Sequence, residues 1–224
     1  MDNNTFTTFG NEFALDTTNI HATPIGGGKV GRATAMPIAP TTSGTEALIL
    51  GGIDWTVEAH NLADHFEAPN AMHTTISTRS DTGGIVGING KKHHIIQNDV
   101  LAEFGDAIRQ VRPDASYVCG GEKNGGQTTF LMLELADGLQ IGGGDEIRRQ
   151  ILIGTHHNGG KLFAAAVQFR PFCTNQWSGL MKGRQRLVEV PHTASAEQRI
   201  KQAVYTLEAA VTTFDEWDRG LRYL

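Results

Sequence analysis

Two glycine-rich turns, each flanked by apolar segments of strand length, constrain the fold of this chain more than any other feature. The first spans residues 122–126, between "ASYVCGG" and "QTTFLMLELADG". The second spans residues 157–160, between "RRQILIGTH" and "KLFAAAVQF". Strands joined by such short turns pair antiparallel, because a parallel pair needs a long crossover connection. The sequence therefore predicts an antiparallel sheet built from long hairpins.

Further elements are predicted on either side of these hairpins. A short helix "TEALILGG" begins near Thr45 and leads into a strand in which Ile53, Trp55 and Val57 alternate. Two more strands flank the turn at residues 81–84. A helix follows over "NDVLAEFGDAIRQV", with Asn98 or Asp99 as its N-cap.

The last predicted element is a long amphipathic helix. Ser195 and Gln198 have the spacing of a capping box, and apolar residues recur every three to four positions from Ile200 to Trp217. The predicted fold class is α+β, with an antiparallel sheet of long hairpins packed against two helices, of which the C-terminal one is long and amphipathic.

The chain divides into an arm, residues 1–44, and a single α+β core domain, residues 45–224. Thr, Asn, Gly and Pro dominate the arm, as in "TPIGGGKVGRATAMPIAPTTSG", and little periodicity is present. Two interpretations remain open for it: a flexible tail, or an arm that becomes ordered only against a neighbouring subunit.

The charge distribution is uneven. The formal net charge is −5, which argues against a protein that is basic over its whole surface. Residues 1–70 hold two basic and eight acidic side chains, whereas residues 145–201 hold nine basic and four acidic ones. Any polyanion partner is therefore expected at one local face.

The expected location is the cytoplasm of the host cell. The two cysteines, Cys119 and Cys173, form no CxxC pair and fit a reducing compartment. The N-terminus "MDNNTFTTFG" is polar and does not resemble a signal peptide. No apolar run approaches the roughly 20 residues that a membrane-spanning helix needs.

The stretch "FRPFCTNQW", residues 169–177, raises the question of a catalytic cysteine. Cys173 would need a nearby base, which His156, His157 or His192 could supply, but no spacing indicates this. A small buried cysteine is the commoner case. Strand alternation places Leu162, Ala164, Ala166, Gln168 and Arg170 on one face, whose small and polar end leaves room for a ligand. No catalytic residue is assigned.

Metal and phosphate sites are not predicted. Adjacent residues on a strand point to opposite faces, so the pairs His93-His94 and His156-His157 are poor chelators. No HExxH motif or Cys/His ligand spacing is present. "PIGGGKVG" and "IGGGDE" do not match a Walker loop. No cofactor is expected.

A mixture of cationic and aromatic residues surrounds the second hairpin. Single-stranded nucleic-acid grooves use this combination, because charges follow the phosphates while rings stack on bases. The alternative is an ordinary solvated charged face over an aromatic core. The candidate nucleic-acid-binding residues are Arg148, Arg149, Lys161, Arg170, Thr174, Asn175, Trp177, Lys182, Arg184 and Arg186.

Six motifs in order, from about residue 51 to 193, resemble those of the phage/plasmid-like protein family long known as a domain of unknown function. They correspond to that family's Gly-x-Asp-Trp strand, Arg-x-Asp-Thr-Gly turn, Gln-Asn, Thr-x-x-x-Gly hairpin, Arg-x-x-Cys-x-Asn turn and His-Thr. The family's N-terminal Pro-Trp-His-Gly-Leu-Gly has at best an echo in "TPIGGGKVG". The matching segments are "GGIDWTVE", "TRSDTGGIVGI", "HHIIQND", "ILIGTHHNGG", "VQFRPFCTNQW" and "PHT".

The resemblance implies a mobile-element setting. The order of elements is also distantly similar to the core of phage single-strand annealing recombinases, which form rings or filaments and hold a strand in a basic groove on the sheet without a nucleotide cofactor. By that analogy Arg170, Thr174, Asn175 and Trp177 would line the groove, with Cys173 packed beneath. The acidic arm could contact the next subunit.

The expected function is that of a phage- or plasmid-encoded single-stranded DNA-binding and annealing protein, acting in recombination as a homo-oligomer without enzymatic turnover. An alternative is a metal-dependent or cysteine/histidine enzyme, or a counter-defence factor, that acts on a small molecule through the His156-His157 turn with Cys173 or His192. A structural assembly protein that uses its glycine-rich arm for subunit contacts is a third possibility.

Overall fold

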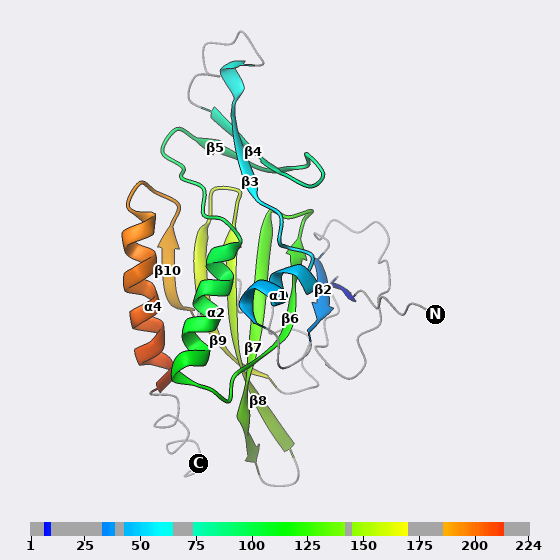
Figure 1. Ribbon diagram of the computed structural model, residues 1–224, viewed down its shortest axis with the longest axis vertical. Helices are drawn as coiled ribbons and strands as arrows, with labels where there is room; N and C mark the ends of the chain where they lie inside the picture. The colour runs from blue at the N-terminus through cyan, green and yellow to red at the C-terminus, as the bar shows by residue number, and fades with distance from the viewer. Residues whose placement is uncertain are drawn as a thin grey trace.

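The computed structural model describes residues 7–9, 33–38, 43–64, 74–141, 145–169 and 186–212. Its strands and helices are shown in Figure 1. In chain order they are β1 (Thr7–Phe9), β2 (Ala33–Pro37), α1 (Gly44–Leu50), β3 (Val57–Asn61), the 3₁₀ helix η1 (Leu62–Asp64), β4 (Thr74–Arg79), β5 (Ile85–Gly90), α2 (Asp99–Val111), β6 (Ser116–Lys123), β7 (Thr128–Ile141), β8 (Asp145–His156), β9 (Lys161–Phe169), β10 (Arg186–Pro191) and α4 (Ala196–Thr212).

The strands form two antiparallel sheets. The large sheet has seven strands in the order β1-β2-β6-β7-β8-β9-β10, and the small sheet has three in the order β3-β4-β5. Both hairpins predicted from the glycine-rich turns are present, as β6–β7 and β8–β9. The predicted α+β class with an antiparallel sheet is confirmed, and the described residues include three α-helices, of which α1 is the short helix predicted near Thr45.

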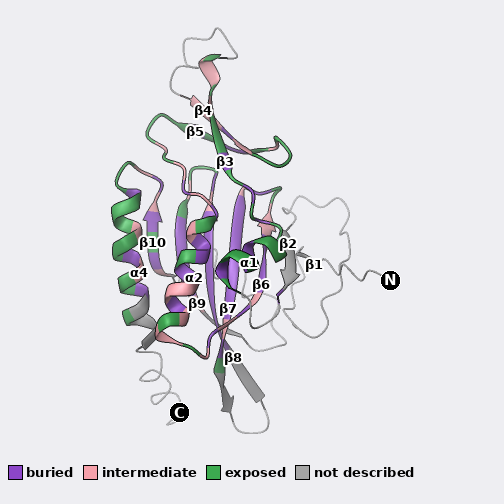
Figure 2. Cartoon of the chain, in the orientation of Figure 1, coloured by how far each residue is buried: buried purple, intermediate pink, exposed green. Residues whose placement is uncertain are grey.

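The three helices cover one face of the large sheet (Figure 1). Alternate residues of the central strands, such as Leu131 and Leu133 of β7 and Ile151 and Ile153 of β8, join one core cluster with residues of α1, α2 and α4. Figure 2 shows that the helices are buried toward the sheet and exposed on the outside. Burial of this apolar surface, worth roughly 25 cal/mol per Å², holds the layers together.

The opposite face of the large sheet is also buried. Phe130, Met132, Leu152 and Phe163 alternate with the residues of the helix-covered core and are each at most 1% exposed. The large sheet is therefore apolar on both faces, and its strands read as nearly continuous hydrophobic runs instead of alternating ones.

Two strands lie within the stretch predicted as an arm. β2 pairs with β6, from Ala33 opposite Lys123 to Pro37 opposite Cys119, and β1 pairs with β2. Ile38, directly after β2, is 6% exposed and belongs to the core. These segments extend the large sheet beyond β6. The remainder of residues 1–32 lies outside the described residues.

The C-terminal helix α4 begins directly after Ser195, as its capping-box spacing predicted. Ala203 and Leu207 are buried against the core, whereas Lys201 and Tyr205 are exposed. The predicted helix extends to Trp217, but residues after Thr212 lie outside the described part of the chain. In the described residues we find no helix with the length and apolar character needed to cross a membrane.

The small sheet lies beyond the end of the large sheet where the β6–β7 and β8–β9 turns lie (Figure 1). Its backbone and side chains bond to the β8–β9 turn: Asn89 Nδ2 donates to the His157 carbonyl at 2.9 Å, and Ile88 N donates to Asn158 Oδ1 at 3.4 Å. We call the contact region between the small sheet and these turns the junction.

Candidate functional site

The predicted cationic residues that fall within the described part of the chain lie on three adjacent strands. Arg148 and Arg149 belong to β8, Lys161 begins β9 and Arg186 begins β10. For Arg148 and Arg186 the structure describes the backbone position alone. The predicted residues that lie outside the described part are Arg170, Thr174, Asn175, Trp177, Lys182 and Arg184.

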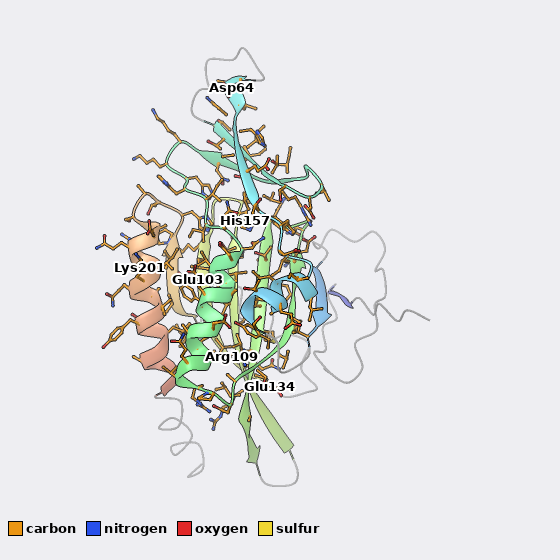
Figure 3. The ribbon with its side chains drawn as sticks, viewed as in Figure 1. Asp64, Glu103, Arg109, Glu134, His157 and Lys201 are labelled. Carbon is orange, nitrogen blue, oxygen red and sulfur yellow. The ribbon has the colours of Figure 1, made fainter. Side chains whose placement is uncertain are left out.

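Strand register places these positions at different levels of the large sheet. Arg148 is opposite Phe169, the last residue of β9, and Arg186 is opposite Ala165 of the same strand. The chain therefore leaves the sheet at Phe169 and returns at Arg186 on the neighbouring strand. Phe169 lies beside Arg148, whereas Arg186 is level with Leu152, four positions or about 13 Å of strand from that end. We call the end of the sheet at Arg148 and Phe169 the cationic end. It lies far from His157, toward the end where Glu134 is labelled in Figure 3.

Two predicted residues differ from the rest. Arg149 is 7% exposed and lies opposite Leu135 and Gln168, so it is a buried residue of the sheet. Lys161 lies at the other end of β9 and forms an ion pair with Glu189 of β10. Eight residues separate it from Phe169, or about 26 Å of strand at roughly 3.3 Å per residue. Lys161 is therefore remote from the cationic end.

The strand face expected to leave room for a ligand is covered by the helices at its first two positions, whereas Ala166 is half-buried. Leu162 and Ala164 are fully buried and belong to the core beneath the helices. Arg170, at the end of this face, lies outside the described residues.

A second polar region, which the sequence did not reveal, lies at the junction around Asn98. The Asn98 side chain donates from Nδ2 to the Trp55 carbonyl at 3.0 Å. Its Oδ1 accepts from the Thr129 hydroxyl at 2.7 Å and lies 3.0 Å from His157 Nε2. Asn98 occupies the N-cap position of α2 as predicted, but its side chain makes no capping hydrogen bond.

Histidine side chains extend this network along the junction. His192 Nε2 lies 2.9 Å from the Thr155 hydroxyl, and the His192 ring stacks on His93 with centroids 4.8 Å apart. His157 and His192 meet edge to face at 6.4 Å. The labelled His157 lies between the two sheets in Figure 3. The signal that sequence reasoning missed is that His157 and His192 fall in two of the family-like motifs.

Burial keeps these imidazoles neutral. Desolvation lowers the pKa of His157 to about 3, with the neighbouring His192 acting in the same direction. Desolvation also lowers the pKa of His192 to about 4, with His93 adding to the effect and the His94 backbone opposing it. Neutral rings can bond to hydroxyl and amide groups without carrying a buried charge. The network therefore holds the two sheets together at neutral pH.

The histidine pair at the hairpin tip does not converge on one point. His156 Nδ1 lies 2.8 Å from the Thr128 hydroxyl, and its ring stacks on Phe163 at 5.1 Å. His157 turns instead toward Asn98. Within the described residues, no three His, Cys, Asp or Glu side chains are arranged to hold a metal ion.

Arg79 also joins the two sheets. Its guanidinium bonds both carboxylate oxygens of Glu122 on β6, at 2.8 and 2.9 Å, and pairs with Asp81 in its own turn. It also lies 4.5 Å from the centroid of the Trp55 ring. Hydrogen bonding to Arg79 lowers the pKa of Asp81. This arginine belongs to the Arg-x-Asp-Thr-Gly turn, so the motif has a structural role.

Cys119 has no features of a nucleophile. It is fully buried on β6, and desolvation raises the pKa of its thiol to about 12. A thiol in this environment stays protonated at neutral pH. Cys173, the cysteine considered from the sequence, lies outside the described residues.

Comparison with known proteins gives one match. A family model described as "Domain of unknown function (DUF932)" matches residues 86–224, which is more than half of the chain. The match includes the cationic end, β6 to β10 and α4. No curated protein and no solved structure matches this chain.

Proposed function

The chain belongs to the DUF932 family, and from this premise we propose that it is a single-stranded DNA-binding and annealing protein of a phage or plasmid, acting in recombination as a homo-oligomer. The proposed DNA-binding surface is the cationic end with residues 170–185. Ring or filament assembly is part of the proposal.

The observation that carries the proposal is that a segment rich in cations starts at the cationic end of the sheet. Residues 170–185 contain Arg170, Lys182 and Arg184; they follow Phe169, which lies opposite Arg148, and lead into Arg186 on the adjacent strand β10. Such a segment can follow a phosphate backbone although the net charge of the chain is −5. Phe172 and Trp177 of the same segment supply rings on which bases can stack.

Binding of this kind depends on salt rather than on base sequence. Each phosphate neutralised releases counterions, so the logarithm of the affinity falls linearly with the logarithm of salt concentration. Stacking on aromatic rings tolerates every base. We therefore expect a labelled single strand to bind with little sequence preference and with an affinity that weakens steeply as salt is added.

The test is a variant in which four cations at or next to the segment become alanine. The expected result is loss of most of the binding in fluorescence-anisotropy titrations, and a smaller salt slope for what remains, because fewer phosphates are neutralised. The four residues changed to alanine are Arg170, Lys182, Arg184 and Arg186.

A matched control removes the same number of cations elsewhere. The replaced lysines lie on the small sheet's exposed turn, at the junction end of β9 and on α4, and we expect binding to change little. Equal losses in both variants would mean that overall charge, and not the cationic end, governs binding. The control residues changed to alanine are Lys91, Lys92, Lys161 and Lys201.

A further inference from the structure

The two edges of the small sheet differ in which of their outward backbone groups are used. On β5, Ile88 N donates to Asn158 Oδ1 at 3.4 Å, and the Gly90 carbonyl accepts from His93 N at 2.9 Å. Each of these consecutive outward positions has one backbone group bonded to another part of the same chain, which lies against this edge. The β5 edge is therefore closed to another strand.

The β3 edge is closed at Val57 but not beyond it. The Gln97 side-chain amide bonds both backbone groups of Val57: Val57 N donates to Oε1 at 2.7 Å and Nε2 donates to the carbonyl at 2.9 Å. Ser80 N donates to the Thr56 carbonyl at 2.9 Å, so Thr56 faces β4 and Val57 faces outward.

The same alternation makes Ala59 an outward position. Backbone groups of successive strand residues point to opposite sides, so the N–H and C=O of Ala59 point away from β4, like those of Val57. Ala59 is exposed, and neither group has a hydrogen-bond partner among the described residues beyond the β3–β4 pairing. Such an edge is a template for a further strand.

The side chains beside Ala59 make this edge complementary to itself. In an antiparallel pair of two β3 strands with Ala59 opposite its own copy, Glu58 of each chain lies opposite His60 of the other. Their side chains are 56% and 42% exposed, and within one chain Glu58 Oε2 lies 3.8 Å from His60 Nε2. A register shifted by two residues would place His60 opposite its own copy and lose both Glu–His pairs.

We propose that β3 is a self-association edge, at which a second copy of this chain pairs antiparallel about Ala59 with Glu58 facing His60. The central pair of Ala59 hydrogen bonds forms without change elsewhere. Extending the ladder to Val57 and Asn61 requires the Gln97 amide to release Val57. This inference deepens the self-association in the proposed function but needs no DNA. Because this pairing has two-fold symmetry, it uses the β3 edge of both subunits and produces a closed dimer. A ring or filament would therefore need a second contact elsewhere on the protein.

The first test is Ala59→Pro, with Ala59→Ser as its matched control. Proline removes the outward N–H and leaves the hydrogen bonds to β4, whereas serine keeps the N–H. In sedimentation velocity of the full chain without DNA, over a wide range of concentration, the wild-type and serine proteins should associate. The proline protein should remain monomeric with an unchanged circular dichroism spectrum.

A charge exchange tests the register and does not depend on how proline is tolerated. Glu58→Lys places a cation opposite His60, and His60→Glu places two carboxylates opposite each other, so each single variant should weaken association by about twofold to fivefold. The double variant, which carries both substitutions, places a lysine opposite a glutamate in each pair and should recover association.

Three outcomes would overturn the proposal: a wild-type protein that is monomeric at every concentration, association that survives Ala59→Pro in a folded protein, or a double variant no better than the singles. Since no DNA is present, none of these outcomes bears on strand binding by the cationic end. Loss of binding in the alanine variant of the cationic end would likewise leave the β3 edge unaffected.

Discussion

Asn98 joins three parts of the chain through one side-chain amide. The strand segment at Trp55, β7 at Thr129 and the hairpin tip at His157 each contribute a polar group to it. Leaving a buried polar group without its hydrogen-bond partner costs roughly 1–3 kcal/mol of stability. The position was predicted as a helix cap because Asn is common there. The tertiary contacts instead draw its side chain away from the helix.

The buried histidines give the fold a predictable dependence on pH. His157 and His192 have pKa values lowered to about 3 and about 4, whereas an unfolded chain takes up these protons near pH 6.5. Above pH 6.5 these two histidines therefore do not lower the free energy of unfolding. Below it, the free energy of unfolding decreases as the pH falls toward 4. The expected slope is on the order of 1 kcal/mol per pH unit for each histidine.

This dependence is measured by chemical denaturation at a series of pH values between 6.5 and 4.5. His157→Gln should reduce the slope, because a group that takes up a proton only on unfolding has been removed. His94→Gln is the control, since His94 is exposed. Asp81 and Asp114 have pKa values lowered by their arginine partners and titrate below this window. An unchanged slope in His157→Gln would contradict a buried neutral ring.

At the scale of elements, α2 packs on the large sheet with Gly105 facing the ring of Tyr117. A Cβ on Gly105 would overlap the Tyr117 side chain, at 2.6 Å from Cε1 and 2.7 Å from Cζ. The Tyr117 hydroxyl donates to Asp106 at 2.9 Å, and Asp106 accepts from Gly44 N at the start of α1. This contact joins α1, α2 and β6 in one place.

Gly105→Ala should destabilise the protein although alanine favours helices. On propensity alone the change would stabilise by roughly 0.5–1 kcal/mol, but overpacking against Tyr117 costs about 1–3 kcal/mol. The unfolding free energy measures the balance. Glu103→Ala, at an exposed position of the same helix, should have little effect. A more stable Gly105→Ala protein would show that α2 can move away from the sheet at no cost.

For the whole molecule, the two proposals place DNA and a second subunit at different ends. The cationic end lies at one end of the large sheet, and the small sheet lies beyond the other (Figure 1). Annealing needs two strands to meet, which self-association can favour by raising their local concentration. Binding of one DNA strand does not require self-association.

Ala59→Pro is therefore expected to separate the two activities. Its affinity for a single strand, measured by anisotropy, should remain within about twofold of the wild type, while the rate of annealing two complementary labelled strands should fall toward the uncatalysed rate. Ala59→Ser is the control. Full annealing by a monomeric protein would mean that β3 pairing has no part in the reaction.

The order and type of most elements followed from the sequence alone. Glycine-rich turns and apolar periodicity are local signals, and they predicted both long hairpins, the strands around residues 81–84, α2 and the start of α4. The strands β1, β2 and β10 were not predicted, because short strands without a turn signal are defined by the neighbours they pair with.

Only the tertiary structure decided which predicted residues share a location. Local charge patterning grouped Lys161 with the arginines, whereas strand register separates it from the cationic end and burial removes Arg149 from the surface. At the junction, Asn98 meets His157 across 59 positions of sequence, and Ile88 meets Asn158 across 70. Local sequence determines which backbone conformation each segment prefers and how its apolar residues are spaced. Which distant residues meet, how deeply they are buried and how their pKa values shift depend on strand register and on the packing of the whole fold.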